Sequence, residues 1–118
     1  IVEGVRARVA GAPVIGFPRG AAGMIRRYAD ETGVNVLGLD YAMPLEFAGQ
    51  ALPLGLAVQG NLDPLRLVVG GDQMERRVRQ IVAAFADRPH IFNLGHGIVP
   101  ETPIAHVARL VDIVKGKA

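Results

Sequence analysis

The sequence contains no cysteine among its 118 residues. This absence excludes disulfide bonds, thiolate metal ligands and cysteine nucleophiles, and it agrees with a reducing cytoplasm, where we expect the protein to act. No apolar run approaches the length of about 20 residues that a membrane-spanning helix needs. A charged leader with an apolar segment and a small-residue cleavage site, the mark of secretion, is also missing. We therefore expect no membrane partner.

A large excess of charge of one sign is also missing, since the net charge is only +2. The positive side chains are mostly arginines, and they do not form a basic stripe with interleaved aromatic residues. Because such a stripe is the usual mark of nucleic-acid binding, we expect no nucleic-acid partner. Arginine suits bidentate recognition of carboxylates, so an anionic small molecule stays an open ligand class. The plainer explanation of the arginine bias is genome composition together with solvated helix faces.

The length of the chain suits at most one domain with a modest core. The first residue is Ile1 rather than methionine, and residues 1–10 resemble the end of a helix or linker already under way. We therefore expect the chain to be part of a longer protein.

Four short apolar runs bounded by turn-forming residues predict β-strands. They are rich in branched residues and lack polar–apolar alternation, which is typical of strands buried on both faces in a parallel sheet. Segments with apolar residues on one face predict helices between and after them. The predicted strands cover residues 13–17, 34–39, 54–58 and 91–94, and the predicted helices cover residues 24–32, 44–50, 72–86 and 103–115.

Several residues are predicted to begin or end these helices. Gly33 suits the left-handed position after a helix, and Pro44 suits a first turn. Asp72 and Glu75 form a capping-box-like pair, and Thr102 is predicted to cap the last helix.

Strands that alternate with helices predict an α/β fold with a parallel sheet and right-handed crossovers. Two architectures fit this order. One is a small doubly wound sheet, and the other is four consecutive units, the C-terminal half, of a (β/α)8 barrel, which needs about 250 residues when complete.

Polar side chains follow each predicted strand, at the edge where ligands bind in parallel α/β folds. The strand-end segments are residues 17–19, 40–41, 59–64 and 93–97. Taken singly, four of their polar residues favour an ordinary role as loop residues that cap a helix or satisfy the backbone: Arg19, Asp40, Asn61 and Asp63. His96 differs, because glycines on both sides leave its imidazole unshielded, and histidine can donate to a carboxylate or change charge near neutral pH.

The other two histidines favour structural roles, because His90 precedes a strand and His106 lies beside the apolar face of the last helix. The three histidines fall on separate elements and cysteine is absent, so we expect no metal site. The segment Gly95-His96-Gly97 also lacks the third glycine of a dinucleotide-binding fingerprint.

The strand-end motifs share their order and spacing with one known family. Val-Gln-Gly-Asn-Leu-Asp-Pro at residues 58–64 is followed by Phe-Asn-Leu-Gly-His-Gly-Ile at 92–98 and Pro-Glu-Thr-Pro at 100–103, and residues 14–20 and 38–40 match as well. Together they resemble the C-terminal part of uroporphyrinogen decarboxylase, over nearly the whole chain.

The resemblance implies a single TIM-barrel enzyme, usually dimeric, that works without a metal or organic cofactor. Members of the family remove carbon dioxide from the four acetate side chains of uroporphyrinogen III in haem biosynthesis and yield coproporphyrinogen III, with a protonated pyrrole ring as electron sink. The family's histidine in the last strand-end motif lines the cleft, so the resemblance assigns substrate contact to His96 and leaves proton transfer open. No residue is assigned a certain catalytic role.

The resemblance also implies what these residues lack. The family's arginine-rich N-terminal motif, its pyrrole-binding aspartate and its cleft tyrosine precede the matched region. We therefore expect the 118 residues alone to be inactive, and to expose apolar edges that pair with another copy or with the missing half. Two alternatives stay open: a corrinoid-linked methyltransferase, whose zinc ligands include cysteines, and a non-catalytic α/β binding module.

Overall fold

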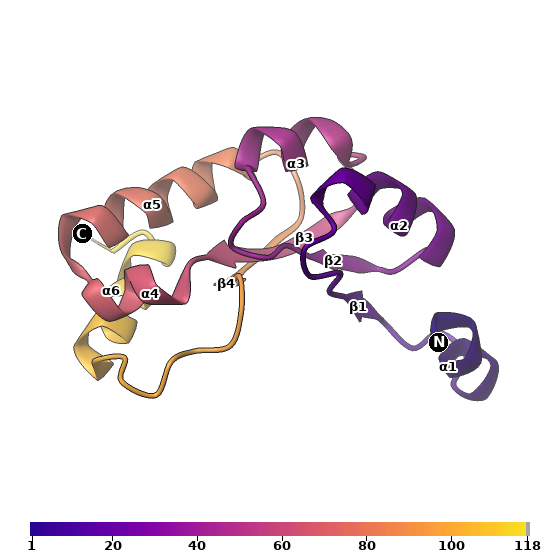
Figure 1. The fold of residues 1–118 in the computed structure, drawn as a ribbon, viewed down its shortest axis with the longest axis horizontal. Coiled ribbons are helices and arrows are strands. Elements are labelled where there is room, and N and C mark those ends of the chain that lie inside the picture. The colour runs from indigo at the N-terminus through magenta and orange to yellow at the C-terminus, as the bar shows by residue number, and fades with distance from the viewer. Residues whose placement is uncertain (118) are drawn as a thin grey trace.

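Four parallel strands form the centre of the computed structural model, which describes residues 1–117. The strands pair in the order β1-β2-β3-β4, and each pair is parallel (Figure 1). Their bounds are β1 Ile15–Gly16, β2 Val36–Gly38, β3 Ala57–Leu62 and β4 His90–Leu94. The predicted α/β class with four parallel strands is confirmed.

Helices precede, separate and follow these strands. Helix α1 lies before β1, and each connection between strands contains at least one helix. Their bounds are α1 Val2–Arg8, α2 Ile25–Thr32 after a 3₁₀ turn at Ala22–Met24, α3 Leu45–Ala51, α4 Pro64–Val69, α5 Gly71–Ala84 and α6 Ile104–Val114.

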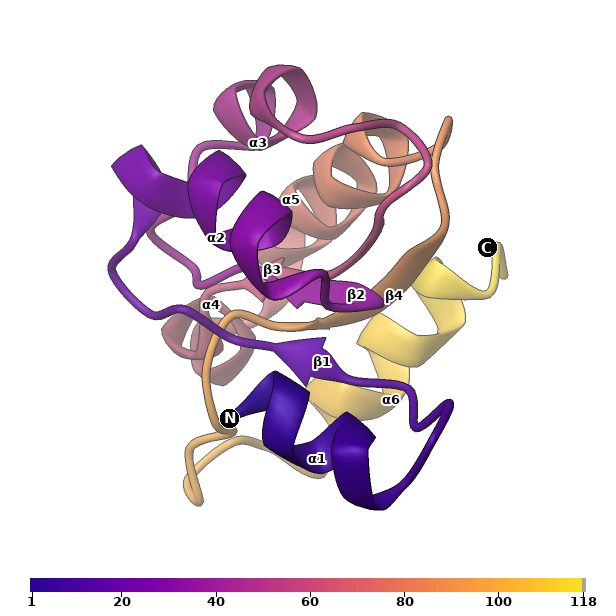
Figure 2. The same ribbon diagram turned by 90° about the vertical axis from the view of Figure 1, so that its right-hand side faces the viewer.

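The strand order distinguishes the two predicted architectures. A doubly wound sheet reverses its strand order at a switch point and carries helices on both faces. Here each strand is added next to the preceding one in the same direction, and α2, α3 and α5 lie on one side of the sheet (Figure 2). This is the arrangement of consecutive barrel units, open at the β1 and β4 edges.

The hydrophobic core fills the space between the sheet and these helices. In register across the sheet, Leu37 and Val58 point toward the helices and are completely buried. The helices contribute further buried side chains, among them Met74, Val78 and Phe85.

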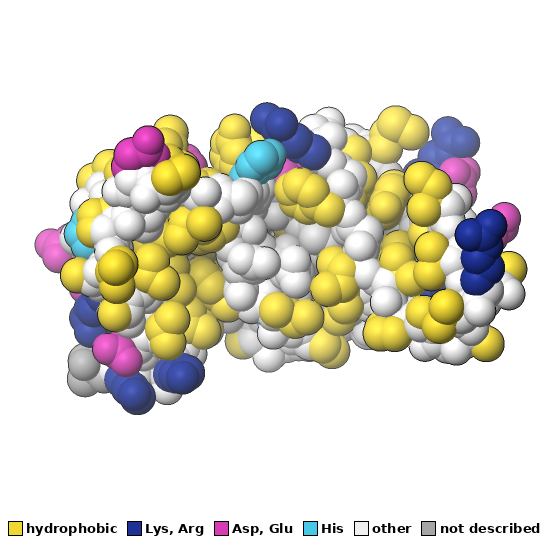
Figure 3. Space-filling model, turned by 90° about the horizontal axis from the view of Figure 1, so that it is seen from below, with side chains coloured by type: hydrophobic (Ala, Val, Ile, Leu, Met, Phe, Trp, Pro, Cys, Tyr) yellow, Lys and Arg dark blue, Asp and Glu magenta, His cyan; other side chains and the backbone are white. Residues whose placement is uncertain are grey.

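The opposite face of the sheet is uncovered. Ile15, Phe17 and Ile91 are 49%, 45% and 46% exposed there, far more than the completely buried core residues on the helix side. Hydrophobic side chains spread across this side of the molecule in Figure 3. The sequence predicts strands that are buried on both faces, whereas here one face is exposed. It is the face that a closed barrel would bury.

The third strand differs from its prediction over residues 54–58. It begins at Ala57 and continues to Leu62, while Leu56 donates to the carbonyl of Pro53 in a preceding turn. The polar residues of 59–62 therefore lie in a strand and not in the following loop. The prediction was wrong because the polar side chain of Asn61 can be buried in a strand: its amide donates to backbone carbonyls of the segment that follows β2. The fourth strand begins at His90, which was predicted to precede it.

Several predictions about helix ends need correction. Helix α4 was missed; Asp63 caps it by accepting from the backbone N–H of Leu65 at 2.9 Å, with Pro64 in the first turn. The side chain of Thr102 makes no hydrogen bond within the described residues, and Pro103 takes the N-cap position before α6. By contrast, Gly33 ends α2 in the left-handed conformation as predicted, with φ of 58°.

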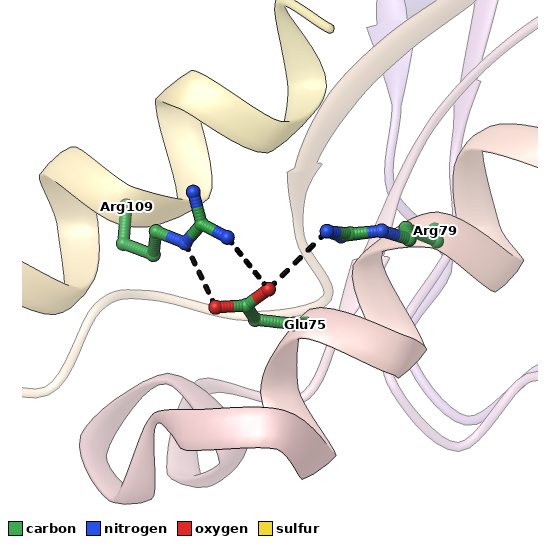
Figure 4. A network of polar contacts seen from close by, with 3 residues as sticks. All are labelled: Glu75, Arg79 and Arg109. Atoms are coloured by element: carbon green, nitrogen blue, oxygen red, sulfur yellow. Dashed lines mark hydrogen bonds and ion pairs between the residues drawn. The ribbon is translucent and has the colours of Figure 1, made fainter. Parts of the chain in front are cut away.

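Glu75 does not form the predicted capping box. Its carboxylate accepts two hydrogen bonds from the guanidinium of Arg109, both at 2.8 Å, and one from Arg79 at 3.3 Å (Figure 4). The bidentate pair joins α5 to α6. The hydrogen bonds from Arg109 lower the pKa of the Glu75 carboxyl below its ordinary value of 4.5, and the same pair raises the pKa of Arg109.

We predict that this ion pair makes stability depend on pH. Because the folded-state pKa of Glu75 is lowered, its contribution is fully present above pH 4.5 and is lost as the pH falls through the lowered value. Thermal unfolding should show a lower midpoint for Glu75→Gln than for the wild type at pH 7, with the difference shrinking in acid. In an Arg109→Gln background the pH-dependent effect of the substitution should be much smaller, because only the longer contact with Arg79 remains. A difference that stays constant down to pH 3 would show that the pair is not the cause.

Candidate functional site

The carboxyl ends of the four strands meet at one edge of the sheet, where a small hollow opens. Because parallel strands point the same way, the segments that follow them lie side by side there. The hollow has a volume of about 200 Å³ and is lined by side chains from all four predicted strand-end segments: Arg19, Tyr41, Asp63 and His96.

Asp40 and Asn61 support this edge from below rather than lining the hollow. The Asp40 carboxylate is 6% exposed and accepts from the backbone N–H groups of Gly20 at 2.7 Å and Ala42 at 2.9 Å. The buried Asn61 amide donates to the carbonyls of Asp40 at 3.1 Å and Met43 at 2.8 Å. These contacts hold the segments after β1 and β2 in place. The predicted ordinary role of both residues, satisfying the backbone, agrees with this geometry.

Gly95 sets the position of the histidine-bearing segment. Its N–H donates to the carbonyl of Leu62 at 2.7 Å, and a Cβ atom at this position would lie 2.6 Å from Tyr41 Cα and closer still to the Tyr41 nitrogen. Only glycine allows the two backbones to approach so closely. Gly97, on the other side of His96, has open space around it.

His96 stands between two hollows. Its imidazole is exposed and lies edge-on to the ring of Phe17, with 6.5 Å between ring centroids and 66° between ring planes. On one side is the strand-end hollow. On the other side is a larger one, about 590 Å³, which reaches over the uncovered face and includes Gln59 and Asn93. The side chain is therefore placed to contact a ligand in either hollow.

The other two histidines have structural contacts, in agreement with their predicted roles. The His90 ring lies between Phe85 and Phe92, at centroid distances of 5.0 and 6.0 Å, and its Nε2 lies 2.9 Å from the carbonyl oxygen of Gly60. His106 Nδ1 lies 2.9 Å from the carbonyl oxygen of Leu67.

Two further observations concern other classes of site. Among residues 1–117, no three histidine, aspartate or glutamate side chains gather closely enough to hold a metal ion. No helix in this described part is long and apolar enough to cross a membrane.

Sequence reasoning missed a second polar hollow beside the first. Arg66 on α4 and Arg77 on α5 line it, together with Tyr41 and Asp63, which also line the strand-end hollow. The hollow depends on α4. The pair Asp63-Pro64, a capping residue followed by a proline, is the signal that could have predicted this helix.

The fold and the site together define a class of protein. Four consecutive β/α units, with polar and aromatic side chains from each strand end around one histidine, form the ligand-binding edge of a barrel-type α/β protein. The family model described as uroporphyrinogen decarboxylase matches residues 1–116. The chain belongs to the uroporphyrinogen decarboxylase family, as the resemblance implied, and the two alternative interpretations find no support in this match.

Curated relatives agree with the family. The chain is 55% identical over 116 residues to a uroporphyrinogen decarboxylase of Sphingopyxis alaskensis and 54% identical over 116 residues to one of Rhizorhabdus wittichii. It is 50% identical over 115 residues to that of Hyphomonas neptunium. These matches cover 98% of the chain and 33–34% of each relative. The chain spans about a third of the length of the curated relatives it matches.

We predict that Gly95→Ala disturbs the site whereas Gly97→Ala does not. The new methyl group at Gly95 meets the Tyr41 backbone, which has no flexible end to move aside, and such overpacking costs about 1–3 kcal/mol. The methyl group at Gly97 meets nothing within 4 Å, so this variant is the matched control. Urea unfolding measures both changes. Equal stability of the two variants would contradict the close approach of the segments after β2 and β4.

Proposed function

We propose that the protein containing this chain removes carbon dioxide from the four acetate side chains of uroporphyrinogen III and yields coproporphyrinogen III in haem biosynthesis. The observation that carries the proposal is the family match over residues 1–116, which includes the whole strand-end edge with His96. The relatives named above bear the name uroporphyrinogen decarboxylase.

The chemistry of the two hollows suits such a substrate. The larger hollow combines the rings of Phe17 and Phe92 with the amides of Gln59 and Asn93, so it offers apolar surface for a pyrrole ring and polar groups at its rim. The guanidinium of Arg19 at the neighbouring hollow can donate two hydrogen bonds to a carboxylate. A tetrapyrrole with carboxylate arms needs both kinds of surface.

In this proposal His96 is a substrate-binding residue. Its exposed ring makes no hydrogen bond to other described residues, so both nitrogens are free to contact a substrate carboxylate or a pyrrole N–H. The reaction needs a proton on the ring carbon next to the one that carries the acetate arm, which makes the ring a cationic electron sink. The electrons of the bond to the carboxylate then flow into the ring as carbon dioxide leaves and an exocyclic methylene forms. This methylene takes up a second proton to become the methyl group, and the ring carbon releases the first proton, so one proton is consumed for each carbon dioxide lost. No metal or organic cofactor takes part in this sequence.

We further propose that these residues form one wall of the active site in a cytoplasmic homodimer. The uncovered face of the sheet, with Ile15, Phe17 and Ile91 exposed, supports burial against further strands of the same barrel. The family's arginine-rich motif, pyrrole-binding aspartate and cleft tyrosine would then complete the cleft from the part of the protein that precedes the matched region.

We predict that His96→Ala in the full-length protein lowers kcat/KM for uroporphyrinogen about ten- to hundredfold. This is the loss expected for a charge-assisted hydrogen bond to substrate. The exposed position of His96 should leave the thermal midpoint unchanged. His106→Gln is the matched control; it removes a structural histidine and should lower the midpoint while leaving kcat/KM near the wild-type value. Wild-type kcat/KM in His96→Ala would refute the substrate contact.

A further inference from the structure

A second hollow, of about 370 Å³, lies beside the strand-end hollow and has a polar lining. Tyr41 and Asp63 belong to both hollows, so the two are neighbours. The rest of its lining comes from the end of β3, from α4 and from α5: Asn61, Arg66, Gln73, Arg76, Arg77 and Gln80.

Helix α5 contributes one side of this hollow through a single stripe. Gln73, Arg76, Arg77 and Gln80 are spaced at i, i+3, i+4 and i+7, which places them on one face of the helix. The buried face of α5 is a different one, formed by Met74, Val78 and Ile81. The stripe carries long side chains with hydrogen-bond donors and no carboxylate.

The arginines of the hollow differ from most other helical arginines in the chain. On α2, Arg26 and Arg27 each pair with a carboxylate four residues on, and Arg79 on α5 pairs with Glu75. None of the ion pairs among residues 1–117 includes an arginine of the hollow, that is Arg66, Arg76 or Arg77.

The one carboxylate in the lining does not neutralise them. Asp63 Oδ1 accepts from the backbone N–H of Leu65, which caps α4. Three guanidinium groups and one carboxylate leave the hollow with a net positive charge.

The positive charge of this hollow is held unfavourably at Arg77. Partial burial lowers the pKa of the Arg77 guanidinium, and the nearby cation of Arg66 lowers it further. The partly buried Arg77 cation is therefore repelled by the exposed Arg66 cation beside it. A bound anion would relieve this repulsion and take up the donors of the stripe.

We propose that this hollow binds a small, doubly charged oxyanion, with Arg66 and Arg77 as its principal ligands and Gln73, Gln80 and the Tyr41 hydroxyl as further donors. A phosphate group and a small dicarboxylate share this chemistry. Its arginines lie on α4 and α5 and do not line the hollows beside His96, so they are distinct from the residues assigned to the proposed decarboxylation, while Tyr41 borders both sites.

The test is a calorimetric titration of the full-length protein with inorganic phosphate, and in parallel with succinate, in a low-salt buffer. The proposal expects saturable binding of at least one of the two to the wild type. The double variant Arg66→Gln/Arg77→Gln should weaken it about tenfold or more, the loss expected when charge-assisted hydrogen bonds disappear. The matched control Arg26→Gln/Arg27→Gln removes the same charge from α2 and should bind like the wild type.

The outcomes separate clearly. Arginine-dependent binding of phosphate alone identifies a phosphate-bearing ligand, and arginine-dependent binding of succinate alone identifies a dicarboxylate; both support the oxyanion site. Binding that is equal in all three proteins, or the absence of binding by both probes, overturns it. Arg66 is exposed on α4, so the single variant Arg66→Gln provides the same comparison if the double variant unfolds. Uroporphyrinogen turnover by the same samples reports separately on the decarboxylase proposal.

Discussion

The close packing of the Gly95 backbone against Tyr41 is the constraint on which the arrangement of the site depends. It ties the segment after β4 to the segment after β2. Asp40, next to Tyr41, accepts from the backbone N–H of Gly20 and so ties in the segment after β1, and Asn61 fixes the carbonyl of Asp40 from β3. The four strand ends are therefore held together by contacts to the backbone, two of which are made by the buried Asp40 and Asn61 side chains, and the side chains that line the hollow stay available to a ligand.

The uncovered face of the sheet links the fold to the proposed function. Ile15, Phe17 and Ile91 are exposed on the face where a closed barrel would have its interior, and Phe17 also touches the ring of His96. The same apolar surface thus supports two roles. It is a packing surface for further strands, and at its upper edge it becomes part of the hollow that suits a pyrrole ring. The further strands that would cover this face would therefore also complete the active site. The predicted pairing with another copy stays a prediction.

The sequence predicted what depends on local pattern and missed what depends on distant partners. Short apolar runs predict the four strands, and the rule that ligands bind at the carboxyl ends of parallel strands predicts that His96 lies at this edge. The extent of β3 was wrong because Asn61 is buried through carbonyls from another segment. Glu75 was assigned to a cap because its true partner, Arg109, lies 34 residues away. The cluster of Arg66 and Arg77 could not be foreseen without α4.

The central claim is that these residues form one wall of an active site that the rest of the protein completes. The most direct measurement compares coproporphyrinogen formation from uroporphyrinogen III by the full-length protein and by residues 1–118 alone, at equal concentrations. Our account predicts turnover by the full-length protein and none by the isolated chain. Coproporphyrinogen formation by the isolated chain would contradict it.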